Sequence, residues 1–86
     1  MSKDDPLYRG PVKRSVTIAG HQTSISLEPA YWDALGSAAE AAGLPVNALI
    51  ARIDAERIAV ANPPNLASAV RLWLFARAAT IETNSH

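Results

Sequence analysis

The stretch HQTSISLEP, residues 21–29, places the tightest constraint on how this chain folds. Apolar Ile25 and Leu27 alternate with polar Ser24 and Ser26, which is the two-residue period of a strand with one dry and one wet face. Pro29 follows almost at once and suits the first turn of a helix, where its missing N–H costs nothing. The sequence therefore predicts a half-buried strand that leads directly into a helix.

A second alternating segment lies upstream of this strand. Val16 and Ile18 alternate with Ser15 and Thr17. Gly20 then offers a turn, because glycine accepts a positive φ without a steric cost. Two arrangements fit this pattern: a β-hairpin, or one long strand with a glycine bulge.

Two helices are expected after the strand region. The first begins at Pro29 and runs to about Ala42, with Gly43 as the residue that ends it. The second begins at Pro45 or Val46, and its apolar residues recur at i, i+3, i+4 and i+7, which forms a single apolar stripe. The residues of this stripe are Val46, Leu49, Ile50 and Ile53.

The third expected helix spans about residues 66–79, with Asn65 as its N-cap. Its apolar residues face several directions, so more than one neighbour must cover it. A chain of 86 residues buries only about 60 % of its unfolded surface, and without cysteine no disulfide can compensate. We therefore expect a mostly helical homodimer with a single domain over residues 12–83, a flexible arm over 1–11 and a frayed tail over 84–86.

Composition excludes several functions. No stretch approaches the ~20 apolar residues of a membrane span, and the N-terminus lacks the apolar segment of a signal peptide. Two scattered histidines without cysteine make a metal site improbable, and nothing implies a cofactor. His21 with Ser24 or Ser26 is the nearest approach to a catalytic pair, and no third group supports it, so we expect no enzyme. The absence of cysteine fits a cytoplasmic protein.

Charge is zero overall but unevenly distributed. Residues 1–14 carry four cations against two carboxylates, whereas residues 28–57 carry five carboxylates against two arginines. A basic patch can attract phosphates even on a neutral protein. The N-terminal stretch therefore keeps nucleic acid among the candidate partners.

The order strand, proline, helix, G-x-x-V-N turn and helix resembles the ribbon-helix-helix DNA-binding proteins, in particular short bacterial members whose cellular roles are poorly defined. TSISLEPAYWDAL and AAGLPVNALIARI carry the resemblance, which covers roughly residues 12–60. The segment after residue 61 would be an added helix. Typical members often have Ser or Thr where this chain has Pro45, and longer groove-facing side chains than Ser24 and Ser26.

The resemblance implies an intertwined homodimer that regulates transcription. Two chains pair their strands into one antiparallel ribbon, which enters the major groove of duplex DNA. The start of the second helix then holds a phosphate. Which of the two segments forms the ribbon stays open. The residues implied at the DNA are Lys13, Arg14, Ser15, Thr17, Gln22, Ser24, Ser26, Val46 and Asn47. The residues expected at contacts between chains are Ile25, Leu27, Trp32, Leu49, Ile53 and Trp73.

The alternative is a protein-interaction module similar to an antitoxin. In that case the apolar helix 66–79, with Trp73 at its centre, would bind another protein or join dimers into a tetramer. The zero net charge favours this alternative, and the basic residues 9–14 favour DNA.

Overall fold

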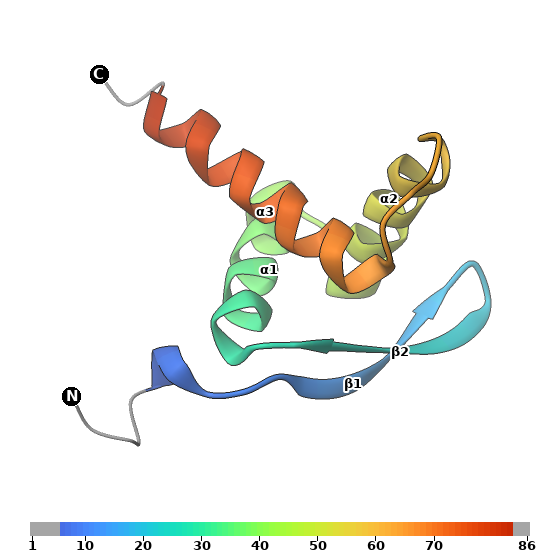
Figure 1. Ribbon diagram of the computed structural model, residues 1–86, viewed down its shortest axis with the longest axis horizontal. Coiled ribbons are helices and arrows are strands. Elements are labelled where there is room, and N and C mark those ends of the chain that lie inside the picture. The colour runs from blue at the N-terminus through green and yellow to red at the C-terminus, as the bar shows by residue number, and fades with distance from the viewer. Residues whose placement is uncertain (1–5, 84–86) are drawn as a thin grey trace.

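The computed structural model describes residues 6–83, which form a two-stranded sheet followed by three α-helices (Figure 1). This confirms the predicted order of a strand region, two helices and an additional C-terminal helix. Residues 1–5 of the expected arm and the expected tail 84–86 lie outside the described residues. The elements are a 3-10 turn η1 (Pro6–Tyr8), β1 (Val12–Ile18), β2 (His21–Leu27), α1 (Pro29–Ala42), α2 (Val46–Ile58) and α3 (Leu66–Thr83).

The strand region is a hairpin and not one long bulged strand. β1 and β2 pair antiparallel in unbroken register, from Val12 opposite Leu27 to Ile18 opposite His21. The two-residue turn between them has positive φ at both Ala19 (52°) and Gly20 (82°). A turn of this hand matches the right-handed twist of paired strands, which explains why the hairpin closes here.

The helix boundaries follow the local signals. α1 begins at Pro29, and its first backbone bonds run to the carbonyl of Glu28. Gly43 ends α1 in the left-handed conformation, with φ of 68°. Asn65 accepts a hydrogen bond from the Ser68 amide at 2.8 Å and so caps α3. α3 continues to Thr83, beyond the predicted residue 79, because residues 78–83 contain no glycine or proline to stop it.

One core joins the hairpin to all three helices. The helices lie on one side of the hairpin and leave its other side open (Figure 1). Six large side chains are almost completely buried between these elements, and each contributes about 1.5–3 kcal/mol relative to an exposed position. These are Leu27 of β2, Leu35 of α1, Leu49, Ile50 and Ile53 of α2, and Val70 of α3.

Several residues expected at contacts between chains lie in this core. Ile25, Leu27, Leu49 and Ile53 are buried, and Trp32 is only 7 % exposed. Their apolar stripes are therefore covered by elements of the same chain. Trp73 of α3 is half-buried at the margin of the core, whereas Leu74, one residue on, is buried.

Candidate functional site

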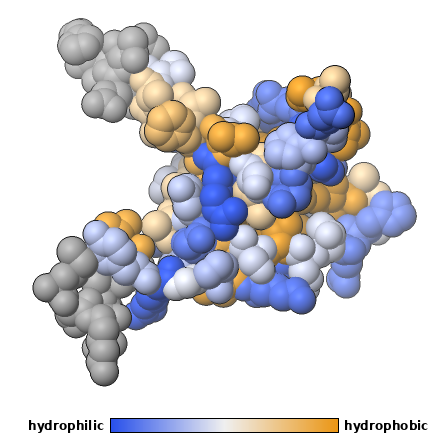
Figure 2. Space-filling model, in the orientation of Figure 1, coloured by the Kyte–Doolittle hydropathy of each residue, from blue (hydrophilic) through white to orange (hydrophobic). Residues whose placement is uncertain are grey.

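The outer face of the hairpin is polar and exposed. In an antiparallel pair, residues directly opposite each other project to the same side. The register pairs Lys13 with Ser26, Ser15 with Ser24, and Thr17 with Gln22, and all six side chains are exposed. We call these six residues the polar ladder. Figure 2 shows mainly blue and white, the colours of hydrophilic and intermediate residues, over the hairpin.

Six of the nine residues implied at the DNA thus come together on a single open face. Three are from β1 and three from β2, so both segments of the strand region contribute. Sequence reasoning left open which segment would form the ribbon, and in the structure the two segments pair with each other within the chain.

Arg14 lies on the opposite face from its neighbour Lys13, because side chains alternate along a strand. Its guanidinium stands over the ring of Trp32, 4.8 Å from the ring centroid. The Trp32 indole N–H also donates a hydrogen bond to the Val12 carbonyl at 2.9 Å. Arg14 therefore clamps β1 to α1 while its charge stays at the flank of the hairpin.

The charge of the hairpin segment is uniformly positive. Residues 9–27 contain Arg9, Lys13 and Arg14 and no aspartate or glutamate. The first carboxylate after the hairpin, Glu28, is paired with Arg71 at 2.7 Å. An anion approaching the polar ladder therefore meets no unpaired carboxylate from the strands.

Val46 and Asn47 lie apart from the ladder, in the first turn of α2. Val46 is half-buried against the core, and Asn47 is exposed. Among the described residues, no hydrogen bond or ion pair joins either residue to the hairpin. It is the other end of α2, with Asp54 and Arg57, that lies near the hairpin tip, where it lines a cavity with Ile18 and His21.

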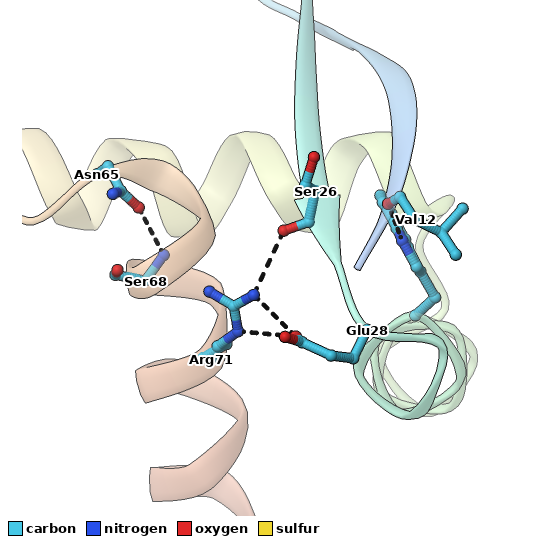
Figure 3. Close-up of polar contacts among 7 residues, drawn as sticks. Val12, Ser26, Glu28, Asn65, Ser68 and Arg71 are labelled. Carbon is cyan, nitrogen blue, oxygen red and sulfur yellow. Dashed lines mark hydrogen bonds and ion pairs between the residues drawn. The ribbon is translucent and has the colours of Figure 1, made fainter. Parts of the chain in front are cut away.

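Sequence reasoning did not find the contact that ties α3 to the hairpin. Arg71 donates from Nε (3.0 Å) and Nη2 (2.7 Å) to Glu28 Oε1, and its Nη2 lies 3.5 Å from the Ser26 carbonyl oxygen (Figure 3). The same guanidinium lies 5.5 Å from the centroid of the Tyr31 ring. Glu28 and Arg71 are 43 positions apart, so no local pattern connects them.

The Arg71 guanidinium changes the acidity of its partner. Its hydrogen bonds, followed by a backbone hydrogen bond, hold the pKa of the Glu28 carboxyl below its ordinary value of 4.5. Glu28 is therefore ionised at neutral pH and keeps the ion pair intact.

The second feature of the surface is the apolar side of α3. Leu72 is 61 % exposed and Phe75 is 73 % exposed. A groove of about 590 Å³ is lined by Leu74 and Phe75 of α3 together with Tyr8 and Tyr31. Exposed apolar area of this kind is typical of an interaction surface.

The described residues give no support to a catalytic or metal centre. His21 projects from the inner side of β2, whereas Ser24 and Ser26 project from the outer side, so the nearest pair of catalytic residue types is separated. No group of three or more His, Cys, Asp or Glu side chains within residues 6–83 is placed to hold a metal ion.

The length and composition of each helix decide whether it could cross a membrane. No single described helix is long and apolar enough to cross a bilayer. α1 and α2 reach the required length only as a pair, which is bent by 95°.

Comparison with known proteins gives one match. A family model described as a ribbon-helix-helix domain matches residues 11–78, which include the hairpin and most of α3. No curated protein and no solved structure matches this chain.

Proposed function

Because this chain belongs to the ribbon-helix-helix domain family, whose members are generally DNA-binding regulators or antitoxins, we propose that it binds duplex DNA and regulates transcription. The hairpin β1–β2 is the ribbon that enters the major groove. A major groove about 12 Å wide admits a two-stranded ribbon of this kind.

The polar ladder is the observation that supports this proposal most strongly. Its side chains match the hydrogen-bonding groups on base edges: the Gln22 amide suits adenine, Lys13 suits guanine, and the hydroxyls of Ser15 and Ser24 suit several bases. The face is open, exposed and free of carboxylates. Arg14 on the other face, over Trp32, and exposed Arg9 before β1 add positive charge to the same segment, which favours an anionic partner.

We also propose that the protein acts as a homodimer. The exposed apolar side chains of α3, with Trp73 beside them, supply a contact for a second copy. Two copies would present two ribbons. We also propose that Val46 and Asn47, at the start of α2, hold a phosphate of the DNA. The binding role requires no catalysis.

A negative charge introduced at the centre of the ladder tests the DNA proposal. Ser24→Glu puts a carboxylate where base edges and phosphates would lie, and it should weaken binding at least tenfold. Fluorescence anisotropy with labelled genomic duplexes at about 50 mM salt measures this. Ser37→Glu is the matched control, because Ser37 is an exposed residue of α1 and is not on the hairpin. Equal binding by the two variants would contradict the proposal.

Because Lys13 and Arg14 lie on opposite faces of the hairpin, replacing each of them gives a second test by the same binding measurement. Lys13→Ala should cost about 1–3 kcal/mol of binding and relax the preference for guanine at one position, as expected for one lost base contact. Arg14→Ala should reduce affinity less, because Arg14 stands over Trp32 on the other face.

An antitoxin-like protein module is the second candidate function. The exposure of Leu72 and Phe75 on α3 favours it, since a bound partner would cover them. Salt separates the two candidates. Binding through several phosphate contacts falls by orders of magnitude between about 50 and 200 mM salt, whereas an apolar protein interface changes little.

A further inference from the structure

We propose that α3 pairs antiparallel with α3 of a second copy, so that Leu72 of each copy packs against Phe75 of the other. This inference rests on the homodimer of the proposed function, and it adds the orientation and register of the contact. The polar ladder is on the side of the hairpin that faces away from the helices, so the contact leaves the strands of both copies free (Figure 1).

The second half of α3 extends beyond the core. α3 has 18 residues, which corresponds to a length of about 27 Å. Leu74 is buried, whereas none of residues 75–80 is buried, and Figure 1 shows this half of the helix projecting past α1 and α2. Its sequence, FARAAT, contains a single charged residue, although the exposed side of a helix is usually polar. We therefore expect a partner to cover this half of α3.

One side of α3 has the spacing of a seam between paired helices. Four residues on this side are separated by four, three and four positions, which aligns them along the helix. We call them the outer stripe: Ser68, Leu72, Phe75 and Ala79. Val70 and Leu74 enter the core from the other side of α3. The outer stripe contains both of the exposed large apolar side chains in the described part of α3, and it carries no charge.

The outer stripe is complementary to itself. In a contact with twofold symmetry, residue i of one copy touches residue j of the other, and residue j touches residue i in return. An antiparallel pair centred between Leu72 and Phe75 therefore makes the contact between these two side chains twice. Ser68 then lies level with the partner's Ala79 at each end, where small side chains let the two helices run close together.

Charge favours the antiparallel orientation over the parallel one. Arg71 and Arg77 are the only charged residues of α3 before Glu82. A parallel pair would set each arginine level with its own counterpart, which is unfavourable for like charges. The antiparallel pair sets Arg71 level with the partner's Ala76, and Arg77 level with the partner's Val70. It also brings the positive N-terminal end of each helix dipole beside the negative C-terminal end of the other.

The size of the outer stripe predicts a reversible association. A large aromatic side chain offers about 150–250 Å² for burial, and Phe75 is 73 % exposed. With Leu72 and the flanking alanines of both copies, the contact falls at the low end of specific interfaces, below about 1,200 Å². Pairing should therefore depend on protein concentration, and a covalent trap is the sharpest test of its geometry.

Cysteine cross-linking tests the orientation directly, because the chain has no cysteine of its own. Ser68→Cys and Ala79→Cys are made in separate chains, which keeps Leu72 and Phe75 intact, and one chain carries a tag that changes its mass. In the antiparallel pair the two different cysteines face each other, whereas two copies of the same variant hold their cysteines about 16 Å apart along the helices. A disulfide needs Cα atoms within about 7 Å. Mild oxidation at micromolar concentration should therefore link the mixed chains at least tenfold more than either variant alone.

Ser37→Cys mixed with Ala79→Cys is the matched control, because Ser37 is exposed on α1 and is not part of the outer stripe. Its linkage measures random collision. Adding Leu72→Ser to the Ser68→Cys chain should bring the mixed linkage down towards this level, since the change removes half of the apolar centre of the stripe.

The possible outcomes separate this inference from the proposed function. If Ser68→Cys links to itself as well as to Ala79→Cys, the antiparallel geometry is overturned and the proposed contact on α3 stands. If the mixed chains link no more than the Ser37→Cys control, the contact itself is overturned. DNA binding is measured separately with Ser24→Glu, so its failure is distinguishable from both results.

Discussion

Ala19 is one of two non-glycine residues with a positive φ in the part of the chain that the structure describes, and alanine tolerates this conformation less well than the other, Asn62. The Ala19 φ of 52° lies in the left-handed region, where a side chain other than glycine or asparagine is strained. This turn sets the register of the hairpin and therefore decides which residues form the polar ladder. Gly20, at φ of 82°, pays no comparable cost.

Ala19→Asn should stabilise the protein. Asparagine followed by glycine is the preferred pair for a turn with two positive φ values, so the strain falls while the hairpin is unchanged. We expect a gain of about 1 kcal/mol, or about 4–8 °C in Tm, measured by circular dichroism at one fixed protein concentration. Ala19→Val is the control and should lower Tm, since a β-branched side chain suits this conformation least. A lower Tm for Ala19→Asn would contradict the turn geometry.

At the level of elements, one ion pair adds to the core packing that places α3 beside the hairpin. Glu28 lies at the junction of β2 and α1, and Arg71 lies on α3, so the pair links three elements. The cap at Asn65 fixes where α3 starts, and the pair fixes how it lies against β2.

Acid should weaken this link. Since the pKa of Glu28 is lowered in the folded chain, its contribution to stability is fully present above its ordinary value of 4.5 and is lost as pH falls through the lower, folded-state pKa. The wild type should therefore lose more stability than Glu28→Gln as the pH falls through this acidic range. Urea unfolding at a series of pH values measures this, and equal acid sensitivity of both proteins would show that the pair is unimportant.

For the whole molecule, the central question is what covers α3. The core closes within one chain, so a second copy is not required to bury the apolar faces of β2, α1 and α2. Exposed large apolar side chains remain on α3 (Leu72 and Phe75), and also on η1, at Val12 and around the end of α2. We propose that the contact between copies uses those on α3.

Sedimentation velocity at micromolar concentration should show a dimer, and Leu72→Ser should shift it towards monomer. Leu72 is 61 % exposed, so the change leaves the core intact. Ile58→Ser is the matched control, because Ile58 is 63 % exposed but lies at the end of α2. Trp73→Ala should act like Leu72→Ser. A wild-type monomer, or a dimer unaffected by either change on α3, would contradict the proposed contact.

The sequence by itself determined the local elements of this protein. The alternation around Ile25 predicted β2. Pro29 and Gly43 predicted the two ends of α1, and Asn65 predicted the start of α3. Each appears in the structure as expected. These features depend on interactions between residues a few positions apart, which sequence order specifies directly.

Only the tertiary structure decided the rest. It paired β1 with β2, separated Lys13 from Arg14 on opposite faces, and brought Arg71 to Glu28 across 43 positions. It also buried within one chain five of the six residues expected at contacts between two chains, whereas Trp73 is half-buried. The physical reason is that packing joins surfaces whose partners are distant in sequence. A pattern shows that a face must be covered, but only the folded chain shows which element covers it.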